Sequence, residues 1–206
     1  MKFFAWKENF AKAEPLIVRN RPLPMFLCRV LASRGITTSA AAEAFLNCTQ
    51  PLCDPLALHD MEKAASIVRR AVEDGKKILV FGDYDCDGIT ATVLLYEYLE
   101  GEGADVCYYI PERLNEGYGL SMQTMEMIIS SGIELIITVD NGISALEEIR
   151  RAKEAGIEVV VTDHHALPAE LPPADALVNS AFEDDACPSR YLCGAAMAFK
   201  LSLIHI

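Results

Sequence analysis

Residues 78–88 read ILVFGDYDCDG, an apolar run that leads directly into a cluster of aspartates. The run has the length and composition of a strand that is buried on both faces of a sheet. Asp83, Asp85 and Asp87 then follow at alternate positions. Carboxylates held together in a buried place repel one another and lose hydration, unless cations neutralise them. This stretch therefore predicts a metal site at the end of a strand.

Two other classes of acidic loop share part of this pattern. A calcium-binding EF-hand loop also alternates acids before a glycine, but it needs a glutamate at its twelfth position and a preceding helix. Counted from Asp83, the twelfth residue is Leu94, and the preceding segment is strand-like. A phosphatase with a nucleophilic aspartate would have threonine where Asp87 stands. Neither class fits this sequence.

Two further strand-like runs also end in polar residues. The run at 133–139 is followed by Asp140, and the run at 157–162 is followed by the triplet Asp-His-His at 163–165. Ligands of open parallel sheets bind at the edge formed by the carboxyl ends of the strands. The side chains expected to converge at this edge are Asp83, Asp85, Asp140 and His164.

The rest of the chain alternates strand-like runs with amphipathic helical stretches of roughly 10–15 residues. Strands are predicted at 77–82, 106–110, 134–139, 158–162 and 176–178, and helices at 60–75, 88–101, 121–132, 144–156 and 191–206. Asp87 is expected to cap the helix from Gly88, and Ser144 with Glu147 to form a capping box. The strand runs are apolar without alternation, which predicts an α/β fold with a parallel sheet flanked by helices.

The first 58 residues differ from the rest. Prolines interrupt two short helical stretches at about 25–34 and 39–47. We therefore expect a helical N-terminal segment over 1–58 and a main domain over 59–206. The helical stretch that ends the chain lacks a terminating glycine, so we expect the main domain to be incomplete at its C-terminal end.

Composition restricts the classes of function. A net charge of −12 over 206 residues argues against a protein that coats nucleic acid, though not against an enzyme that holds it through metal ions. No apolar run approaches the roughly 18 residues of a membrane helix. The N-terminus carries charges where a signal peptide is apolar, so we expect a cytoplasmic protein. Seven cysteines without C-x-x-C spacing favour reduced, mostly buried thiols over a zinc site.

Taken together, the motifs resemble those of the DHH phosphoesterases. The matching pieces are GDYDCDG at 82–88, RLNEGYG at 113–119, VDNG at 139–142, TDHH at 162–165 and CGAAMAFKL at 193–201. Within the family, the piece at 113–119 favours the exonucleases specific for single-stranded DNA. The family has a later motif with another metal-binding aspartate beyond Leu201. We therefore expect the 206-residue chain to be weak or inactive alone.

The resemblance implies metal-dependent phosphodiester hydrolysis, most of all a 5′-to-3′ exonuclease of DNA repair and recombination. Such hydrolysis needs an activated water and neutralisation of phosphoryl charge, which two cations supply. Carboxylate and imidazole ligands suit Mn²⁺ or Mg²⁺. We assign Asp83 to one ion, Asp85 and His164 to the other, and Asp140 to both.

Four further residues receive roles with simpler alternatives. His165 would contact the substrate phosphate or the leaving oxygen, or else be a packed histidine. Asp163 would orient an imidazole, as outer carboxylates do around metals. Arg113 would bind phosphate or be a solvated surface residue. Tyr118 would stack on a base of single-stranded DNA or pack internally.

Two other functions stay open at this point. A phosphodiesterase of the same family could act on short oligonucleotides or cyclic dinucleotides. A scaffold that binds nucleic acid without turnover could keep the fold, although its acids would then be free to degenerate. Asp83, Asp85, Asp140 and His164 are all present, which favours an enzyme.

Overall fold

The computed structural model describes residues 12–48, 52–112, 119–182 and 192–204. The chain divides into two compact units, residues 1–52 and 53–206. The boundary predicted after residue 58 lies inside the second unit, and the functional division into a helical segment and a catalytic domain stays a prediction. Among the helices of the described residues, none has the length and apolar character needed to cross a bilayer.

The N-terminal unit contains the two expected helices, α1 (Met25–Ser33) and α2 (Ser39–Leu46). It also contains an antiparallel pair, β1 (Ile17–Val18) and β2 (Arg21–Pro22), which the sequence patterns did not indicate. The turn between these strands has positive φ at both Arg19 and Asn20. Such turns usually contain glycine, so this one lacks the usual sequence signal.

The second unit is built on a five-stranded parallel sheet, as predicted. Its strands are β3 (Ile78–Phe81), β4 (Val106–Tyr109), β5 (Leu135–Val139), β6 (Glu158–Asp163) and β7 (Ala176–Asn179). Their order across the sheet is β4-β3-β5-β6-β7, with every neighbouring pair parallel. The predicted strand positions are confirmed to within one or two residues.

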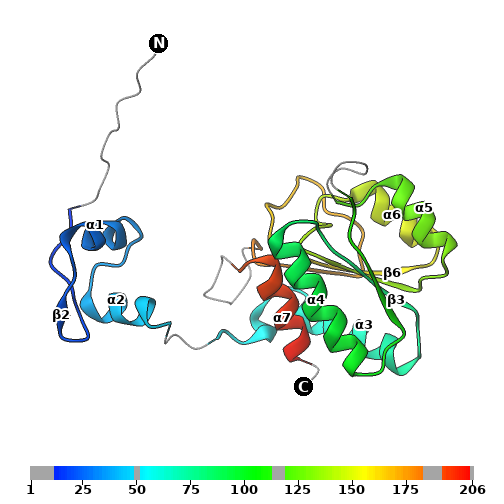
Figure 1. Ribbon diagram of the computed structural model, residues 1–206. Helices are drawn as coiled ribbons and strands as arrows, with labels where there is room; N and C mark the ends of the chain where they lie inside the picture. Colours follow the sequence, from blue (N-terminus) through cyan, green and yellow to red (C-terminus); the bar gives the residue numbers. More distant parts are fainter. Residues whose placement is uncertain (1–11, 49–51, 113–118, 183–191, 205–206) are drawn as a thin grey trace, which may run out of the picture. The chain divides into compact units, whose positions relative to one another are not determined.

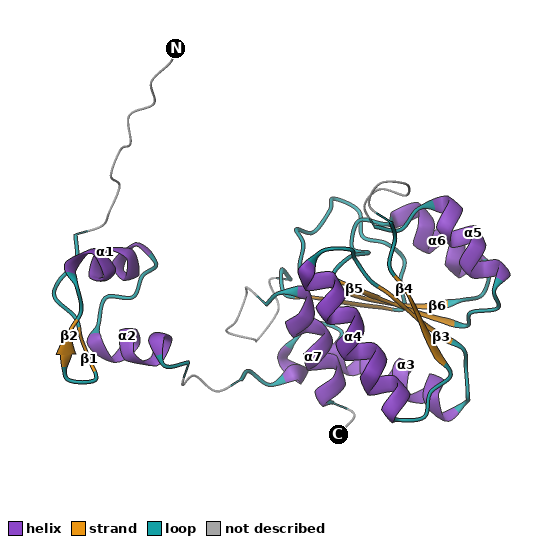
Figure 2. Cartoon of the chain, viewed as in Figure 1, coloured by secondary structure: helices purple, strands orange, loops and turns teal. Residues whose placement is uncertain are grey.

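Helices cover both faces of this sheet (Figures 1 and 2). One face carries α3 (Met61–Glu73), α4 (Cys86–Gly101) and α7 (Gly194–Leu203), and the other carries α5 (Met122–Ser130) and α6 (Leu146–Glu154); a short 3₁₀ turn, Pro55–Ala57, precedes α3. Alternate residues of β3 enter the two cores: Val80 packs with the first layer and Phe81 with the second. Burial on both sides explains why the strand runs are continuously apolar.

The caps of two helices differ from the predicted ones, and Asp60 at the start of α3 makes no side-chain cap. Asp85, not Asp87, caps α4 by accepting hydrogen bonds from the N–H groups of Asp87 (2.8 Å) and Gly88 (2.9 Å). The capping box predicted at the start of α6 is wrong, because Ala145 is the N-cap and makes no side-chain cap. Asp60 precedes α3, but its carboxylate accepts a hydrogen bond from Leu177 N (3.1 Å) instead. The N-cap of α4 thus lies two residues before the predicted one and that of α6 one residue after it, while a tertiary contact engages Asp60.

The cysteines also differ from expectation. Free thiols are found at Cys28, which is buried, Cys107, which is half-buried, and the exposed Cys48, Cys86 and Cys193. Cys53 is disulfide-bonded. The expectation of reduced, mostly buried thiols is therefore wrong for Cys53, and for three of the others the thiol is reduced but exposed.

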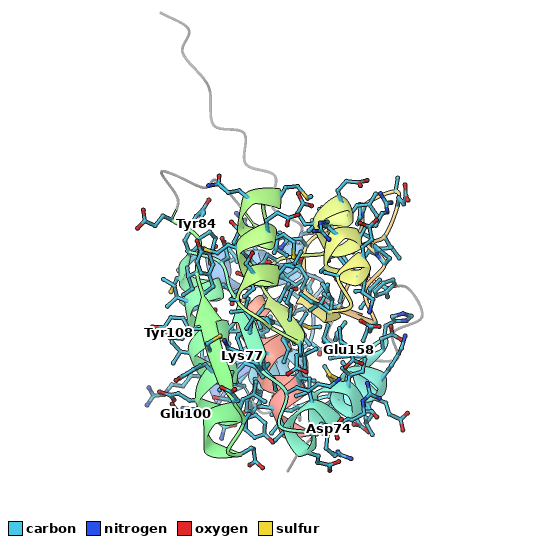
Figure 3. The ribbon with its side chains drawn as sticks, turned by 90° about the vertical axis from the view of Figure 1, so that its right-hand side faces the viewer. Asp74, Lys77, Tyr84, Glu100, Tyr108 and Glu158 are labelled. Atoms are coloured by element: carbon cyan, nitrogen blue, oxygen red, sulfur yellow. The ribbon has the colours of Figure 1, made fainter. Side chains whose placement is uncertain are left out.

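The strand order places the ends of β3 and β5 at a special position. From β3 the chain crosses first to β4 on one side and later to β5 on the other side. At such a switch point the loops leave in opposite directions and open a crevice beyond the carboxyl ends of the strands. Figure 3 shows Tyr84, which follows Asp83, at one end of the sheet and Asp74 at the opposite end. The acidic stretch thus lies at the edge where such folds bind ligands.

Candidate metal centre

Strand register brings the polar residues of three loops together. Phe81 pairs with Thr138 across β3 and β5, so Asp83 and Asp140 each follow a paired residue by two positions. Val139 pairs with Thr162 across β5 and β6, so the triplet 163–165 begins level with Asp140. Because these strands are parallel and adjacent, their loops start side by side at one edge.

Asp140 is held in an unusual environment. Its side chain is buried, with the residue 1% exposed, and its φ of 61° lies in the left-handed region. That conformation is uncommon outside glycine, but aspartate adopts it more readily than most residues. Its amide N–H donates to Thr162 O (3.0 Å), which fixes the backbone. The sharp turn directs the carboxylate toward the neighbouring loops rather than along the strand.

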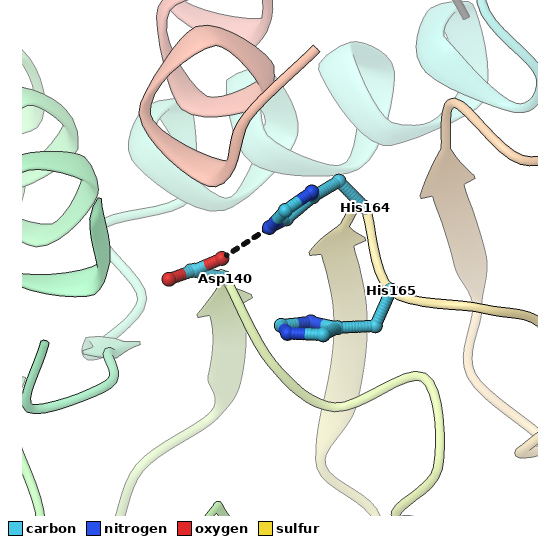
Figure 4. Close-up of side chains that lie close together, drawn as sticks. All are labelled: Asp140, His164 and His165. Atoms are coloured by element: carbon cyan, nitrogen blue, oxygen red, sulfur yellow. Dashed lines mark ion pairs between the residues drawn. The ribbon is translucent and has the colours of Figure 1, made fainter. Parts of the chain in front are cut away.

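The Asp140 carboxylate lacks the partners that a buried charge needs. Its Oδ1 accepts no hydrogen bond, although it lies 3.1 Å from Nε2 of His164 (Figure 4). Burial, together with the negative charges of Asp87 and Asp85, raises the pKa of Asp140 from 3.8 to about 7. Ionising this carboxylate at neutral pH is costly unless a positive charge lies beside it. This is the behaviour expected of a carboxylate that binds a metal ion.

Asp83 shows the same features on the other side of Asp140. The residue is buried, 2% exposed, and its Oδ1 accepts no hydrogen bond. Burial raises the pKa of Asp83, and the charge of Asp85 adds to this, against the lowering effect of the Tyr84 N–H. Gly88 permits the close packing here, since a Cβ on Gly88 would lie 2.6 Å from the Asp83 Cβ.

The potential ligand atoms form two overlapping groups, within each of which all atoms lie within 4.8 Å of one another. One group contains Asp83, Asp85 and Asp140, and the other contains Asp140, His164 and His165. Asp140 belongs to both, as expected for a bridging carboxylate. Asp85, however, groups with Asp83 rather than with His164, so the assignment of ligands to individual ions stays a prediction.

The carboxylate of Asp163 contacts both His164 and His165. Its buried carboxylate accepts hydrogen bonds from the N–H of Ile143 (3.0 Å), His164 (2.7 Å) and His165 (3.1 Å), and from Nδ1 of His165 (2.6 Å). Burial lowers the pKa of His165, but the bond to Asp163 and the nearby carboxylates outweigh it, and the net effect is a raised pKa. Asp163 therefore orients the imidazole of His165 through its Nδ1.

Asp163→Asn is expected to lower the free energy of unfolding by about 2–3 kcal/mol. The amide would turn one N–H toward N–H groups that now donate to a carboxylate. Urea unfolding followed by circular dichroism measures the change, with Asp74→Asn, exposed at the other end of the sheet, as the matched control. An equal, small effect of both substitutions would contradict the role of Asp163.

A cavity of about 250 Å³ opens beside His165. It is lined by Gly119, Leu120, Asn141, Gly142, Ile143, Ser144, Ala145, Glu148, Asp163 and His165. The predicted substrate-binding residues Arg113 and Tyr118 lie outside the described residues, in the segment that precedes Gly119. The cavity gives a substrate group space next to the outer imidazole.

Sequence patterns missed the contribution of α7 to this site. The carboxylate of Asp87 accepts hydrogen bonds from the N–H groups of Gly194 (2.7 Å) and Ala195 (2.8 Å), at the start of that helix. The signal that could have pointed to it is Gly194 itself, since a glycine at the first turn of a helix indicates close approach of other atoms.

The fold and the site together define an α/β domain with two overlapping groups of carboxylate and imidazole side chains that could hold metal ions at its switch point. The chain belongs to the DHH family: the profile described as "DHH family, N-terminal domain" matches residues 77–205. The resemblance inferred from the motifs is thereby confirmed.

Sequence similarity to characterised proteins supports membership of the DHH family. The chain is 40% identical over 187 residues to the single-stranded-DNA-specific exonuclease RecJ of Haemophilus influenzae, covering 90% of this chain and 32% of that protein. It is 39% identical over 174 residues to the RecJ of Bacillus subtilis, covering 84% of this chain and 22% of that protein. The chain thus spans only about a fifth to a third of the length of these relatives.

Solved structures show the same relationship. A crystal structure of exonuclease RecJ bound to manganese matches with a TM-score of 0.68 at 40% identity, covering 74% of this chain and 38% of that one. A structure of RecJ in complex with Mn²⁺ from Thermus thermophilus matches with a TM-score of 0.65 at 33% identity, covering 84% of this chain and 23% of that one.

Proposed function

We propose that this chain carries the metal centre of an exonuclease that hydrolyses single-stranded DNA. The observation that carries the proposal is Asp140, a buried carboxylate that belongs to both groups of potential ligands and has one oxygen without a hydrogen bond. The 5′-to-3′ direction and the role in DNA repair and recombination are further parts of the proposal, and they rest on the resemblance to the exonuclease relatives. A cytoplasmic location is also part of the proposal.

The residues present fit two divalent cations. Asp83 and Asp140 each have a buried carboxylate oxygen without a hydrogen bond, which positive charge would stabilise, and carboxylate with imidazole suits Mn²⁺ or Mg²⁺. The manganese named for two similar structures supports this choice. When bound, such ions supply a water-derived nucleophile and neutralise charge on the phosphoryl oxygens. Asp83, Asp85, Asp140 and His164 would hold them.

Two residues of the chain would assist the reaction: Asp163 would orient the imidazole of His165, and His165 would donate a proton. Asp163 holds Nδ1 of His165 at 2.6 Å and so orients the imidazole, whose Nε2 would contact the substrate. A raised pKa keeps that imidazole protonated further toward neutral pH, which suits a contact to phosphate or proton donation to the leaving oxygen. Arg113 and Tyr118 would bind the phosphate and a base of the strand.

The test compares substrates under single-turnover conditions, so that slow cleavage is detected. The chain, in excess and with Mn²⁺, is incubated with a single strand labelled at either end, the matching duplex, a dinucleotide and a cyclic dinucleotide. We expect Mn²⁺-dependent release of nucleotides from the 5′ end of the single strand. Cleavage of the dinucleotides alone would favour the phosphodiesterase alternative. Binding of the single strand without cleavage, both by this chain and by a version extended to the length of its relatives, would favour the scaffold.

A further inference from the structure

We infer that Asp87 is a positioning residue, which fixes the N-terminus of α7 against Asp140 and thereby sets the affinity of the ion held by Asp140 and His164. This inference rests on the proposed function only for the presence of a metal centre. The hydrogen bonds of Asp87 carry it, because they join the loop after β3 to a helix more than a hundred residues later in the chain.

Asp87 caps the start of α7, which the N-cap residue of that helix does not cap with its side chain. Cys193, the N-cap of α7, makes no side-chain cap hydrogen bond. The first N–H groups of a helix have no partner within the helix, and a carboxylate there also interacts favourably with the helix dipole. Oδ2 and Oδ1 of Asp87 accept from Gly194 N and Ala195 N and so complete this end of the helix.

The helix held in this way lies directly against the bridging carboxylate. A Cβ on Gly194 would lie 2.4 Å from Oδ1 of Asp140 and 2.5 Å from its Cγ. Real Cβ atoms do not come so close, so either the helix or the carboxylate would have to move. Asp87 brings α7 to this position, and Gly194 leaves the space that the position requires.

Asp87 also contacts the imidazole on the same side. Its Oδ2 lies 3.5 Å from Nε2 of His164, the nitrogen that faces Asp140 Oδ1 at 3.1 Å. Loss of Asp87 would therefore disturb Asp140 and His164 together. The other group shares Asp140, but its two remaining members, Asp83 and Asp85, are fixed separately, by the packing of Gly88 and by the cap of α4, so that group should change less.

The experiment measures Mn²⁺ binding by calorimetry and by electron paramagnetic resonance of free Mn²⁺. We expect Asp87→Ala to weaken one of two sites by about 10–100-fold, the range found when outer partners of metal ligands are removed, and to change the other much less. Asp87→Glu keeps the charge but displaces the helix, and we expect it to weaken the same site. Thermal unfolding without metal shows whether each variant is folded.

A matched pair of glycine substitutions separates position from charge. Gly194→Ala leaves every charge in place, and we expect it to weaken the same site and to be non-additive with Asp87→Ala. Gly101→Ala is the control, because a Cβ at Gly101 meets nothing within 4 Å. Normal Mn²⁺ binding by both Gly194→Ala and Asp87→Glu would mean that Asp87 acts through charge alone and would overturn the inference. Absence of Mn²⁺ binding by the native chain would overturn the metal centre itself, and the inference with it.

Discussion

Asp140→Asn is expected to lower Mn²⁺-dependent cleavage of single-stranded DNA by about 10³-fold or more, since a metal ligand contributes several kcal/mol to the stabilisation of transition-state charge. Asp140 is the one residue common to both groups of potential ligands, so its loss affects both ions. An amide keeps the size of the side chain but carries no charge to hold a cation. Single-turnover cleavage and Mn²⁺ titration measure the two effects.

Asp85→Ala is expected to act in the same direction, through the group that it shares with Asp83. Asp74→Asn, at the opposite end of the sheet, is the control and should cleave at the native rate. Near-native cleavage by Asp140→Asn, with the fold intact, would rule out a metal centre in which Asp140 binds both ions.

The metal-free chain is expected to become less stable as the pH rises from about 4 to 8. Asp140 has a folded pKa of about 7 against 3.8 for the ordinary group, so its contribution to stability is complete below 3.8 and is lost as the pH rises through 7. This difference in pKa corresponds to as much as about 4 kcal/mol in the free energy of unfolding. The raised pKa values of Asp83 and His165 act in the same direction.

Asp87 does not oppose this trend in that range. Its pKa is lowered, despite burial, by the N–H groups of Ala195 and Gly194, so its contribution is present above 3.8 and is lost only below it. Urea unfolding at a series of pH values, with a chelator present, measures the loss of stability. Asp140→Asn should remove most of the slope, and Mn²⁺ should restore stability at pH 8 in the native chain alone. A flat profile in the native chain would contradict the strained state of Asp140.

The positions of the strands could be predicted because each is a short apolar run without alternation. Burial on both faces of a parallel sheet imposes this pattern on every residue, as Val80 and Phe81 show by entering opposite cores. The same reasoning located the site. Asp83, Asp140 and the triplet 163–165 follow strand ends, and parallel neighbours bring their ends to one edge.

The local contacts of single acids could not be predicted in this way. Asp85 and Asp87 both stand near the start of α4, and capping preferences alone do not separate them. The separation comes from α7, whose first N–H groups donate to Asp87, while Asp85 caps its own helix. A partner so distant in the chain leaves no periodic signal near residue 87.

The sequence by itself determined the class of fold, the edge that carries the site and the residue types available there, because these depend on hydrophobic patterning and on the length of each segment. Only the tertiary structure decided that Asp140 is shared by two ligand groups, that Asp163 holds His165, and that Gly194 packs on Asp140. These features depend on strand order and on close packing between distant segments. Both are set by how the layers fit together rather than by the residues next to each acid.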